Sequence, residues 1–202
     1  MTIWRGEAPL ILASQSRARQ ALLADAGIAF EAVPADIDER AVQEASGLSA
    51  PGDIAGLLAR EKALSVSSHH AGKYVVGADQ TLALEQRLFS KPAGRVQAAE
   101  HLRALAGRSH ELHSAVAVAR YGKILFASTA IARMTMRQLT ESEIEAYLNE
   151  AGEAVTTSVG AYQLEGLGVH LFERIEGDHF TILGLPLLPL LAFLRSERLL
   201  KL

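Results

Sequence analysis

The 202-residue sequence predicts an α/β fold in which a mixed β-sheet is flanked by helices. Short apolar runs alternate with helical patterns along the chain, and no internal repeat or linker interrupts them. Two long alternating runs are joined by Tyr121-Gly122, which is a hairpin signal and adds antiparallel pairing to the sheet. We therefore expect a single domain over residues 1–202.

The first half of the chain carries clear strand and helix signals. The apolar run at 10–13 predicts a strand, the Ser-Gln-Ser sequence at 14–16 predicts a loop, and the helical pattern that follows runs through Ala26. Gly27 ends this helix, and the next strand at 28–33 ends at a proline. The other elements predicted up to residue 84 are a charged loop at 36–40, a helix at 53–67, a buried strand at 74–78 and a second strand at 81–84.

The second half continues the alternation. A helix at 96–106 is closed by Gly107, and strands at 111–120 and 123–135 flank the hairpin turn. Thr140 and the acidic residues after it are typical of a helix N-cap and first turn. A final helix is predicted at 187–195.

Composition and charge limit the functional classes. Hydrophobic residues make up 49% and aromatic residues 5%, so the core is built mainly from Ala, Leu, Ile and Val. The net charge of -3 argues against a general nucleic-acid-binding protein, and the lack of cysteine excludes disulfides, thiolate zinc sites and cysteine nucleophiles. Residues 1–9 lack the apolar run of a signal peptide, and the most apolar stretch, 181–194, is broken by glycine and proline. We expect a soluble, cytoplasmic protein without a membrane partner.

The sequence Ser-Gln-Ser-Arg-Ala-Arg at 14–19 is the first candidate site. Hydroxyl and guanidinium groups at a strand-to-helix turn favour an anion-binding cradle, to which the N–H groups of the helix would add. The alternative is an N-cap serine with solvated arginines.

The sequence Gly-Ala-Asp-Gln at 77–80 is the second candidate. It follows an apolar strand, so Asp79 is expected at the carboxyl edge of the sheet, where α/β proteins usually bind ligands. The alternative is an aspartate that forms a turn.

Three separated charges, Glu39, Lys62 and Lys91, form the third candidate, each beside the end of a predicted element. Phosphate chemistry needs cations to neutralise charge and carboxylates to hold a metal ion. Each of them taken alone is more consistent with a surface charge.

Other motifs do not support a site. His110 and His113 are expected on opposite faces of a strand and so could not bind one metal ion, and His69-His70 is interpreted as a solvated helix end. The Gly-Leu-Gly sequence at 166–168 lacks the third glycine of a dinucleotide fingerprint, and neither a P-loop nor a Gly-x-Ser-x-Gly elbow occurs.

Together these motifs resemble the Maf family of nucleotide pyrophosphatases over almost the whole chain. The N-terminal signature is Leu-Ala-Ser-Gln-Ser at 12–16 with Arg19, and the catalytic strand end is Gly-Ala-Asp at 77–79. The further matching motifs are Asp-Glu at 38–39, Ala-Arg-Glu-Lys-Ala at 59–63, Ser-Lys-Pro at 90–92, Leu-Thr-Glu-Ser-Glu-Ile at 139–144, Gly-Ala-Tyr-Gln-Leu-Glu-Gly at 160–166, Gly-Asp at 177–178 and Gly-Leu-Pro-Leu at 184–187.

The resemblance implies a two-lobed Maf/Ham1-like fold around a nucleotide-binding cleft, frequent homodimers, and cleavage between the α and β phosphates with Mg²⁺ or Mn²⁺. It implies that Asp79 is the catalytic acid–base residue. The residues it places around the phosphates are Ser14, Ser16, Arg19, Lys62 and Lys91, and those it assigns to base selection are Ala18, Gln80 and Glu165.

Gln80, Glu165 and the stretch at 168–177 resemble the subgroup that acts on 7-methyl-GTP, whereas the pyrimidine-preferring subgroup has Thr and Gln at the first two positions. A carboxylate at Glu165 would accept hydrogen bonds from the ring N–H and the amine of guanine. Ala18 departs from both subgroups, which carry a larger side chain there, and Arg17 replaces the usual proline.

We hypothesise that water attacks the α-phosphorus and pyrophosphate leaves, with Lys62, Lys91 and Arg19 stabilising the charge. An ordinary aspartate is ionised at neutral pH and is a weak base, so Asp79 is either the base or, with Glu39, a ligand of the metal ion. The alternatives to this enzyme are a dTTP/UTP pyrophosphatase and a non-catalytic nucleotide-binding regulator of cell division.

Overall fold

The computed structural model describes residues 3–202, so the first two residues of the N-terminal segment discussed above lie outside the described part. The chain forms two compact units, each assembled from separate segments. Unit 1 comprises Met1–Gln80, Ser114–Ala130 and His179–Leu202, and unit 2 comprises Thr81–His113 and Ile131–Asp178. Within residues 3–202, no helix is long and apolar enough to cross a membrane.

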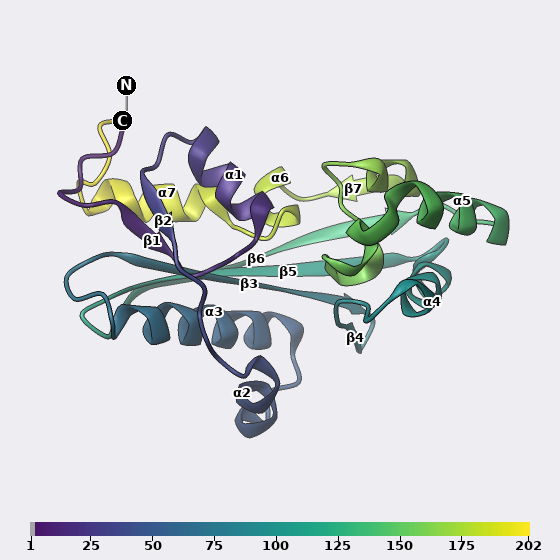
Figure 1. Ribbon diagram of the computed structural model, residues 1–202, viewed down its shortest axis with the longest axis horizontal. Helices are drawn as coiled ribbons and strands as arrows, with labels where there is room; N and C mark the ends of the chain where they lie inside the picture. The colour runs from purple at the N-terminus through teal and green to yellow at the C-terminus, as the bar shows by residue number, and fades with distance from the viewer. Residues whose placement is uncertain (1–2) are drawn as a thin grey trace. The chain divides into compact units, whose positions relative to one another are not determined.

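The strands follow the hydrogen-bonding order β2-β1-β3-β5-β6-β7, with β4 paired to β3 off this path (Figure 1). Pairing of β1 with β2 and with β3 is parallel, whereas β4 and β7 pair in antiparallel fashion with β3 and β6. The sheet is therefore mixed, as the sequence predicts. The strands are β1 Leu10–Leu12, β2 Phe30–Ala32, β3 Val75–Leu84, β4 Arg87–Phe89, β5 Ser109–Arg120, β6 Lys123–Met136 and β7 Phe172–Glu176.

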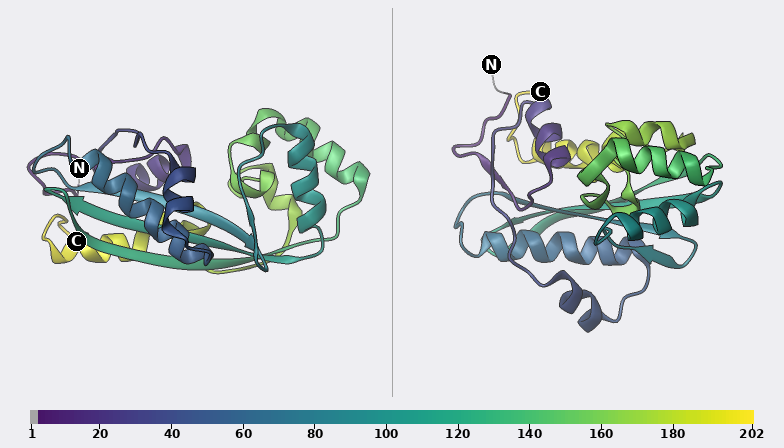
Figure 2. Two further views of the ribbon diagram at one scale, coloured as in Figure 1. Left: turned by 90° about the horizontal axis from the view of Figure 1, so that it is seen from below. Right: turned by 45° about the vertical axis from the view of Figure 1, so that its right-hand side comes forward.

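Unit 1 places helices on both faces of its strands. Even-numbered side chains of the strands, such as Val76 and Val116, join the core that includes α1 and α7, whereas odd-numbered ones, such as Val75 and Ala117, face α3. This alternation follows from the two-residue period of a strand. The helices of unit 1 are α1 Arg17–Asp25, α2 Glu39–Ser46, α3 Pro51–Ser67, α6 His179–Ile182 and α7 Leu187–Ser196. Figure 2 shows α3 extended along the strands in both views.

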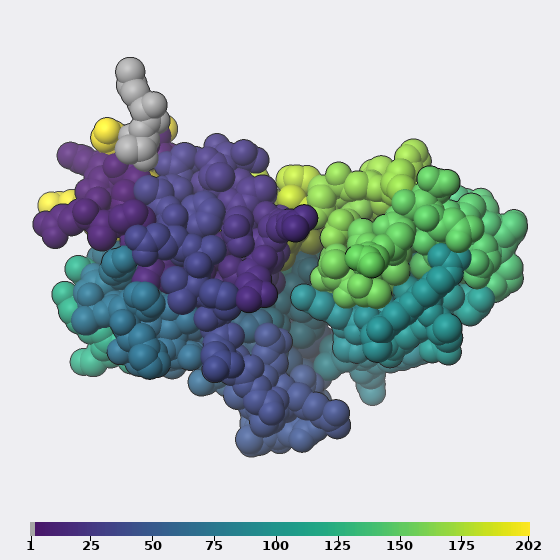
Figure 3. All heavy atoms as spheres, viewed as in Figure 1, coloured from purple at the N-terminus to yellow at the C-terminus, as the bar shows by residue number. Residues whose placement is uncertain are grey.

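The two ends of the described chain meet within unit 1. Trp4 and Leu200 form an antiparallel bridge and are both buried. The space-filling view shows the C-terminal residues emerging beside the N-terminal segment (Figure 3). The bridge connects the N-terminal segment to the residues that follow α7.

Helix α3 lies unusually close to β3 because the facing residues are small. Alanines at 55, 59 and 63 of α3 pack with alanines at 115, 117 and 119 of β5 in one buried cluster. A Cβ atom at Gly77 would lie 2.1 Å from the Ala59 carbonyl oxygen and 2.6 Å from the Ala63 nitrogen. Only glycine at this position permits the contact, since real Cβ atoms do not approach backbone atoms so closely.

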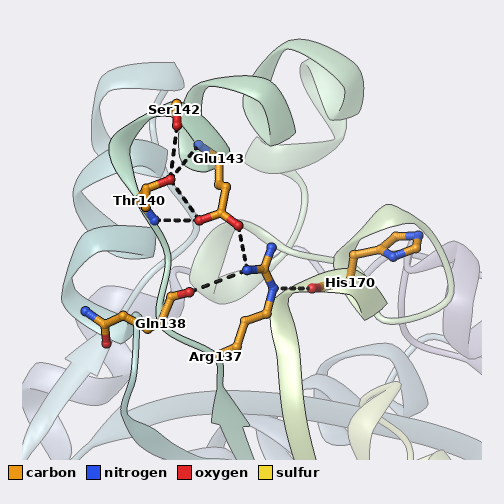
Figure 4. Close-up of polar contacts among 6 residues, drawn as sticks. All are labelled: Arg137, Gln138, Thr140, Ser142, Glu143 and His170. Atoms are coloured by element: carbon orange, nitrogen blue, oxygen red, sulfur yellow. Dashed lines mark hydrogen bonds and ion pairs between the residues drawn. The ribbon is translucent and has the colours of Figure 1, made fainter.

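Unit 2 is organised around α4 Arg95–Leu105 and α5 Glu141–Ala151, which pack against each other. Thr140 is the N-cap of α5, as the sequence predicts, and the structure adds a capping box with Glu143. Glu143 accepts hydrogen bonds from the Thr140 N–H and hydroxyl, at 2.7 and 2.8 Å, and from Arg137 at 2.7 Å (Figure 4). The backbone hydrogen bond from Thr140 and the bond from Arg137 lower the pKa of Glu143 to about 2. Three short 3-10 helices, Gly152–Thr156, Val159–Ala161 and Leu167–Leu171, complete this unit before β7.

Two predictions about local structure were wrong. The strands predicted at 74–78 and 81–84 are one continuous strand, β3, so Asp79 lies within a strand and not at its carboxyl end. It does lie beyond the end of the neighbouring strand, because β1 stops at Leu12, which pairs with Val76. The charged loop predicted at 36–40 ends at Asp38, whose carboxylate accepts from the Ala41 N–H at 3.0 Å and caps α2.

We predict that Gly77→Ala destabilises the protein by about 3 kcal/mol or more, because the added methyl forces α3 away from β3. Thermal or urea denaturation followed by circular dichroism measures the change. Gly56→Ala on α3 is the matched control, since a Cβ atom at Gly56 would meet no atom closer than 3.5 Å. That control should stabilise the protein by roughly 0.5–1 kcal/mol through helix propensity. Equal stability of the Gly77→Ala and native proteins would contradict the close contact.

Candidate active site

The loop before α1 orients its two serines toward the helix terminus. The Ser14 hydroxyl oxygen accepts from the Ser16 N–H at 3.2 Å, and the Ser16 hydroxyl oxygen accepts from the Arg19 N–H at 3.4 Å. Ser16 is thus the N-cap of α1, which confirms that part of the alternative interpretation. Within residues 3–202, the N–H groups of Arg17 and Ala18 have no acceptor, as expected of a first helical turn.

Arg19 is fixed by backbone carbonyls and is not a solvated arginine. Its Nε donates to the Gly184 carbonyl at 2.7 Å, and its Nη1 donates to the Ala78 carbonyl at 2.8 Å and to the Ser14 hydroxyl at 3.3 Å. The last hydrogen bond on this side of β3 joins the Ala13 N–H, just after β1, to the Val76 carbonyl. Arg19 donates to the next carbonyl on the same side of β3, that of Ala78. Burial lowers the pKa of Arg19, while the nearby carboxylates of Asp79 and Glu39 act in the opposite direction.

Lys62 lies between two carboxylates. Its Nζ donates to Asp79 Oδ1 at 2.6 Å and lies 2.8 Å from Glu39 Oε1. The side chains of Lys62 and Asp79 are only 11% and 10% exposed, whereas that of Glu39 is 53% exposed. The structure therefore brings together three of the residues singled out from the sequence, from α2, α3 and β3.

The geometry of this cluster follows from the close contact between α3 and β3. Asp79 lies two residues after Gly77 on β3, so both residues face α3. Lys62 precedes Ala63, which is one of the two α3 residues that touch Gly77. The lysine side chain consequently reaches Asp79 while its aliphatic part is buried. Removal of one partner from an ion pair with so little exposure strongly destabilises the fold, because the other charge stays buried without a partner.

Gln80 points to the opposite face of the strand. Its Nε2 donates to the Ser114 hydroxyl at 2.9 Å and to the carbonyls of Thr181 and Ile182 at 3.2 and 3.0 Å. The amide thereby connects β3 to β5 and to α6, and the carbonyl oxygen of the side chain remains as an acceptor. Gln80 is not part of the carboxylate–lysine cluster around Asp79.

Lys91 and Glu165 belong to unit 2 and are both exposed. Lys91 lies between β4 and α4, and Glu165 lies in the turn between the 3-10 helices Val159–Ala161 and Leu167–Leu171. A cavity of about 210 Å³ adjoins this turn, with Gln163 and Gly166 among its lining residues.

The segment that carries Glu165 is held by two tyrosine contacts, one buried and one half-buried. Tyr162 and His110 share a hydrogen bond of 2.7 Å between the hydroxyl and Nε2, and the Tyr147 hydroxyl donates to the Ala161 carbonyl at 3.2 Å. The rings of His110, Tyr162 and Phe172 pack together at centroid distances of 4.7–5.9 Å. Burial lowers the pKa of His110 to about 4, so the imidazole is neutral at neutral pH. His110 therefore has a packing role in unit 2.

Several residues that hold the site were not identified from the sequence. The partners of Arg19 and Gln80 are mostly main-chain carbonyls, at 78, 181, 182 and 184, which leave no side-chain pattern. Ser114 is an exception, because a serine that interrupts an apolar strand is a signal for a buried hydrogen bond.

Comparison with known proteins gives a consistent result. A family model described as Maf-like protein matches residues 9–197. A protein from Rhodopseudomonas palustris named nucleoside triphosphate pyrophosphatase is 72% identical over 200 residues, which cover 99% of each chain. A protein from Rhizobium meliloti named 7-methyl-GTP pyrophosphatase is 52% identical over 93% of this chain and 95% of its own. Among solved structures, a HAM1 protein from Coxiella burnetii has a TM-score of 0.42 and 17% identity, covering 63% of this chain and 72% of its own.

We predict that acid destabilises unit 2 through His110. Its pKa of about 4 in the folded chain lies below the usual histidine value of 6.5, so the unfolded chain binds more protons between these values. Stability is thus fully present above pH 6.5 and falls as the pH is lowered, by about 2 kcal/mol between pH 7.5 and 5. Urea denaturation of the native protein and of His110→Gln measures this loss, which should shrink in the variant. His170→Gln, at an exposed position of the same unit, should retain it, and equal pH dependence in all three proteins would contradict the assignment.

Proposed function

This chain belongs to the Maf family, and from that premise we propose that it hydrolyses nucleoside triphosphates to nucleoside monophosphates and diphosphate. Relatives at 72 and 71% identity, which this chain matches over nearly their full length, carry the name nucleoside triphosphate pyrophosphatase. The structural observation that carries the proposal is the cluster of Glu39, Lys62 and Asp79. It combines a cation for phosphate oxygens with carboxylates that suit a metal ion or a water molecule.

The groups around α1 support a polyphosphate ligand. Arg19 is held rigidly by two carbonyls, and its electrostatic interaction with Asp79 and Glu39 links it to the cluster. The unpaired N–H groups of the first turn of α1 and the hydroxyls of Ser14 and Ser16 add donors for phosphate oxygens. We propose that these groups bind the phosphates together with Lys62. For Lys91 we propose the phosphate-binding role that the family resemblance implies.

We propose Mg²⁺ or Mn²⁺ as the cofactor, held by Glu39 and Asp79. The fit rests on the donor set, because both carboxylates direct an oxygen to one position, which the Lys62 ammonium occupies. Within residues 3–202, no group of three or more His, Cys, Asp or Glu side chains converges on a metal position. Two carboxylates suffice for such an ion when the substrate phosphates supply further oxygens. When bound, the ion would neutralise charge on the triphosphate.

Asp79 has two proposed roles in hydrolysis. It is either the group that accepts a proton from the attacking water or a ligand of the metal ion. In both roles Lys62 orients the carboxylate through their contact at 2.6 Å, and Arg19 and Lys62 stabilise the charge that develops on the phosphate oxygens. The water attacks the α-phosphorus, the bond from that phosphorus to the bridging oxygen breaks, and pyrophosphate leaves.

For the base we propose a guanine nucleotide of the 7-methyl-GTP type, with dTTP or UTP as the alternative. The relative from Rhizobium meliloti is named for 7-methyl-GTP, and Glu165 supplies an exposed carboxylate that would accept from guanine N–H groups. Within unit 1 we propose a role in base recognition for Ala18 and for Gln80, the latter through its side-chain oxygen. We also propose a cytoplasmic location and a homodimer, in keeping with the family.

The proposed reaction predicts that Asp79→Asn lowers pyrophosphate release by about 100-fold or more, whichever role Asp79 has. The assay measures pyrophosphate with Mg²⁺ or Mn²⁺ for 7-methyl-GTP, GTP, dTTP, UTP and CTP. Asp25→Asn, at an exposed position of α1, should retain native activity. If Asp79→Asn still binds Mn²⁺ as tightly as the native protein, Asp79 is not a metal ligand. No release from any nucleotide despite binding would favour a regulator over an enzyme.

A second variant tests the base. Glu165→Gln should lower kcat/KM for 7-methyl-GTP and GTP by about 10-fold or more, since a charged acceptor is lost, and leave UTP nearly unchanged. Glu173→Gln, at an exposed position of β7 in the same unit, is the matched control. An equal loss for all nucleotides would indicate that Glu165 does not contact the base.

A further inference from the structure

The Lys62 ammonium lies at the position on which the carboxylates of Glu39 and Asp79 converge, at 2.8 and 2.6 Å. Carboxylate oxygens gathered around one point form the environment that a divalent cation such as Mg²⁺ prefers. An ammonium and a divalent ion cannot share this position, because both are positive and both require the same oxygens.

We propose that Lys62 occupies the cation position while the protein is free of nucleotide, and that its ammonium moves to the triphosphate when the divalent ion enters. This inference rests on the proposed function and specifies how its metal ion binds. The free protein thereby avoids two unpaired carboxylates, one of them buried. It also binds the ion weakly until a triphosphate offers the ammonium a new partner.

The contrast with Arg19 identifies Lys62 as the group that moves. Arg19 donates to the carbonyls of Ala78 and Gly184, and moving it would leave both backbone groups without this donor. Among residues 3–202, the Lys62 ammonium pairs only with the two carboxylates, which an incoming cation would neutralise in its place. A lysine also has a flexible four-carbon chain and donors that are not fixed in one plane, so it can change partners at little cost.

The test measures Mn²⁺ binding to the protein in the absence of nucleotide, by the loss of the electron paramagnetic resonance signal of free Mn²⁺. Lys62→Met should bind Mn²⁺ about tenfold or more tightly than the native protein, because a positive charge a few ångströms from the ion is removed. Lys73→Met is the matched control, since Lys73 pairs with Glu31 at 2.9 Å elsewhere in unit 1, and its affinity should equal the native one. Native affinity in Lys62→Met would overturn the proposal.

A double variant locates the bound ion. In Lys62→Met/Asp79→Asn the gain in Mn²⁺ affinity should disappear, because one of the two carboxylates is lost. A gain that persists would place the ion elsewhere and also overturn the proposal.

A measurement on the native side chain covers the case in which Lys62→Met does not fold. Lysine labelled with ¹³C reports the Lys62 ammonium by nuclear magnetic resonance, with Lys62→Arg used to assign the signal. Millimolar Mg²⁺ alone should leave the signal unchanged, and Mg²⁺ with α,β-methylene GTP and α,β-methylene UTP should shift it. A full shift with Mg²⁺ alone, or none with the ion and either analogue together, would contradict the exchange.

Pyrophosphate release by the same native preparation separates the two proposals. Release together with unchanged Mn²⁺ affinity in Lys62→Met rejects the exchange and retains the hydrolase. Lack of release rejects the hydrolase, whatever the result for Mn²⁺.

Discussion

The approach of α3 to β3 at Gly77 is the constraint on which the candidate site depends. A single Cβ at this position would collide with the backbone of α3 at Ala59 and Ala63. The alanines of the facing surfaces extend the contact and replace the larger side chains that usually separate a helix from a sheet. Because the helix lies so close, Lys62 reaches the Asp79 carboxylate directly, and its aliphatic chain fills the remaining space. Packing thus fixes one ion pair of the cluster, while Glu39 joins from an exposed helix terminus.

The sequence predicts elements well wherever a hydrophobic pattern or a cap marks them. The helix ended by Gly27, the hairpin at Tyr121-Gly122 and the helix N-cap at Thr140 are confirmed, since each depends on local chemistry. The unpredicted α2 has only eight residues, none of them buried, and its charged start resembles a loop in the sequence. In β3 an aspartate follows an apolar run and suggests a strand end, but the paired lysine on α3 allows the strand to continue. Such compensation comes from a residue 17 positions away and is invisible to a local pattern.

For the site, the sequence identifies which residues carry charge but not which of them meet. Glu39 and Lys62 belong to one candidate group in the sequence and Asp79 to another, and the structure brings all three together. Asp79 and Gln80 form one motif in the sequence, but the continuity of β3 directs them to opposite faces. Arg19 resembles a free phosphate ligand in the sequence, although two of its nitrogens already serve backbone carbonyls. Arg19 therefore also satisfies the Ala78 carbonyl of β3 beyond the end of β1. The position of this cation consequently depends on the shape of the sheet.

Charge balance in the cluster bears on how a triphosphate would bind. Glu39 and Asp79 offset Lys62 and Arg19, so these four side chains carry no net charge before a ligand arrives. A polyanion that approached alone would be attracted by two cations and repelled by two carboxylates at similar distances. These attractive and repulsive energies would largely cancel. Entry of a divalent cation changes this balance, because it neutralises the carboxylates and releases the ammonium for phosphate oxygens. A site of this composition therefore favours a nucleotide together with its cation over either one alone. These four side chains would thereby make binding depend on the nucleotide and the cation together.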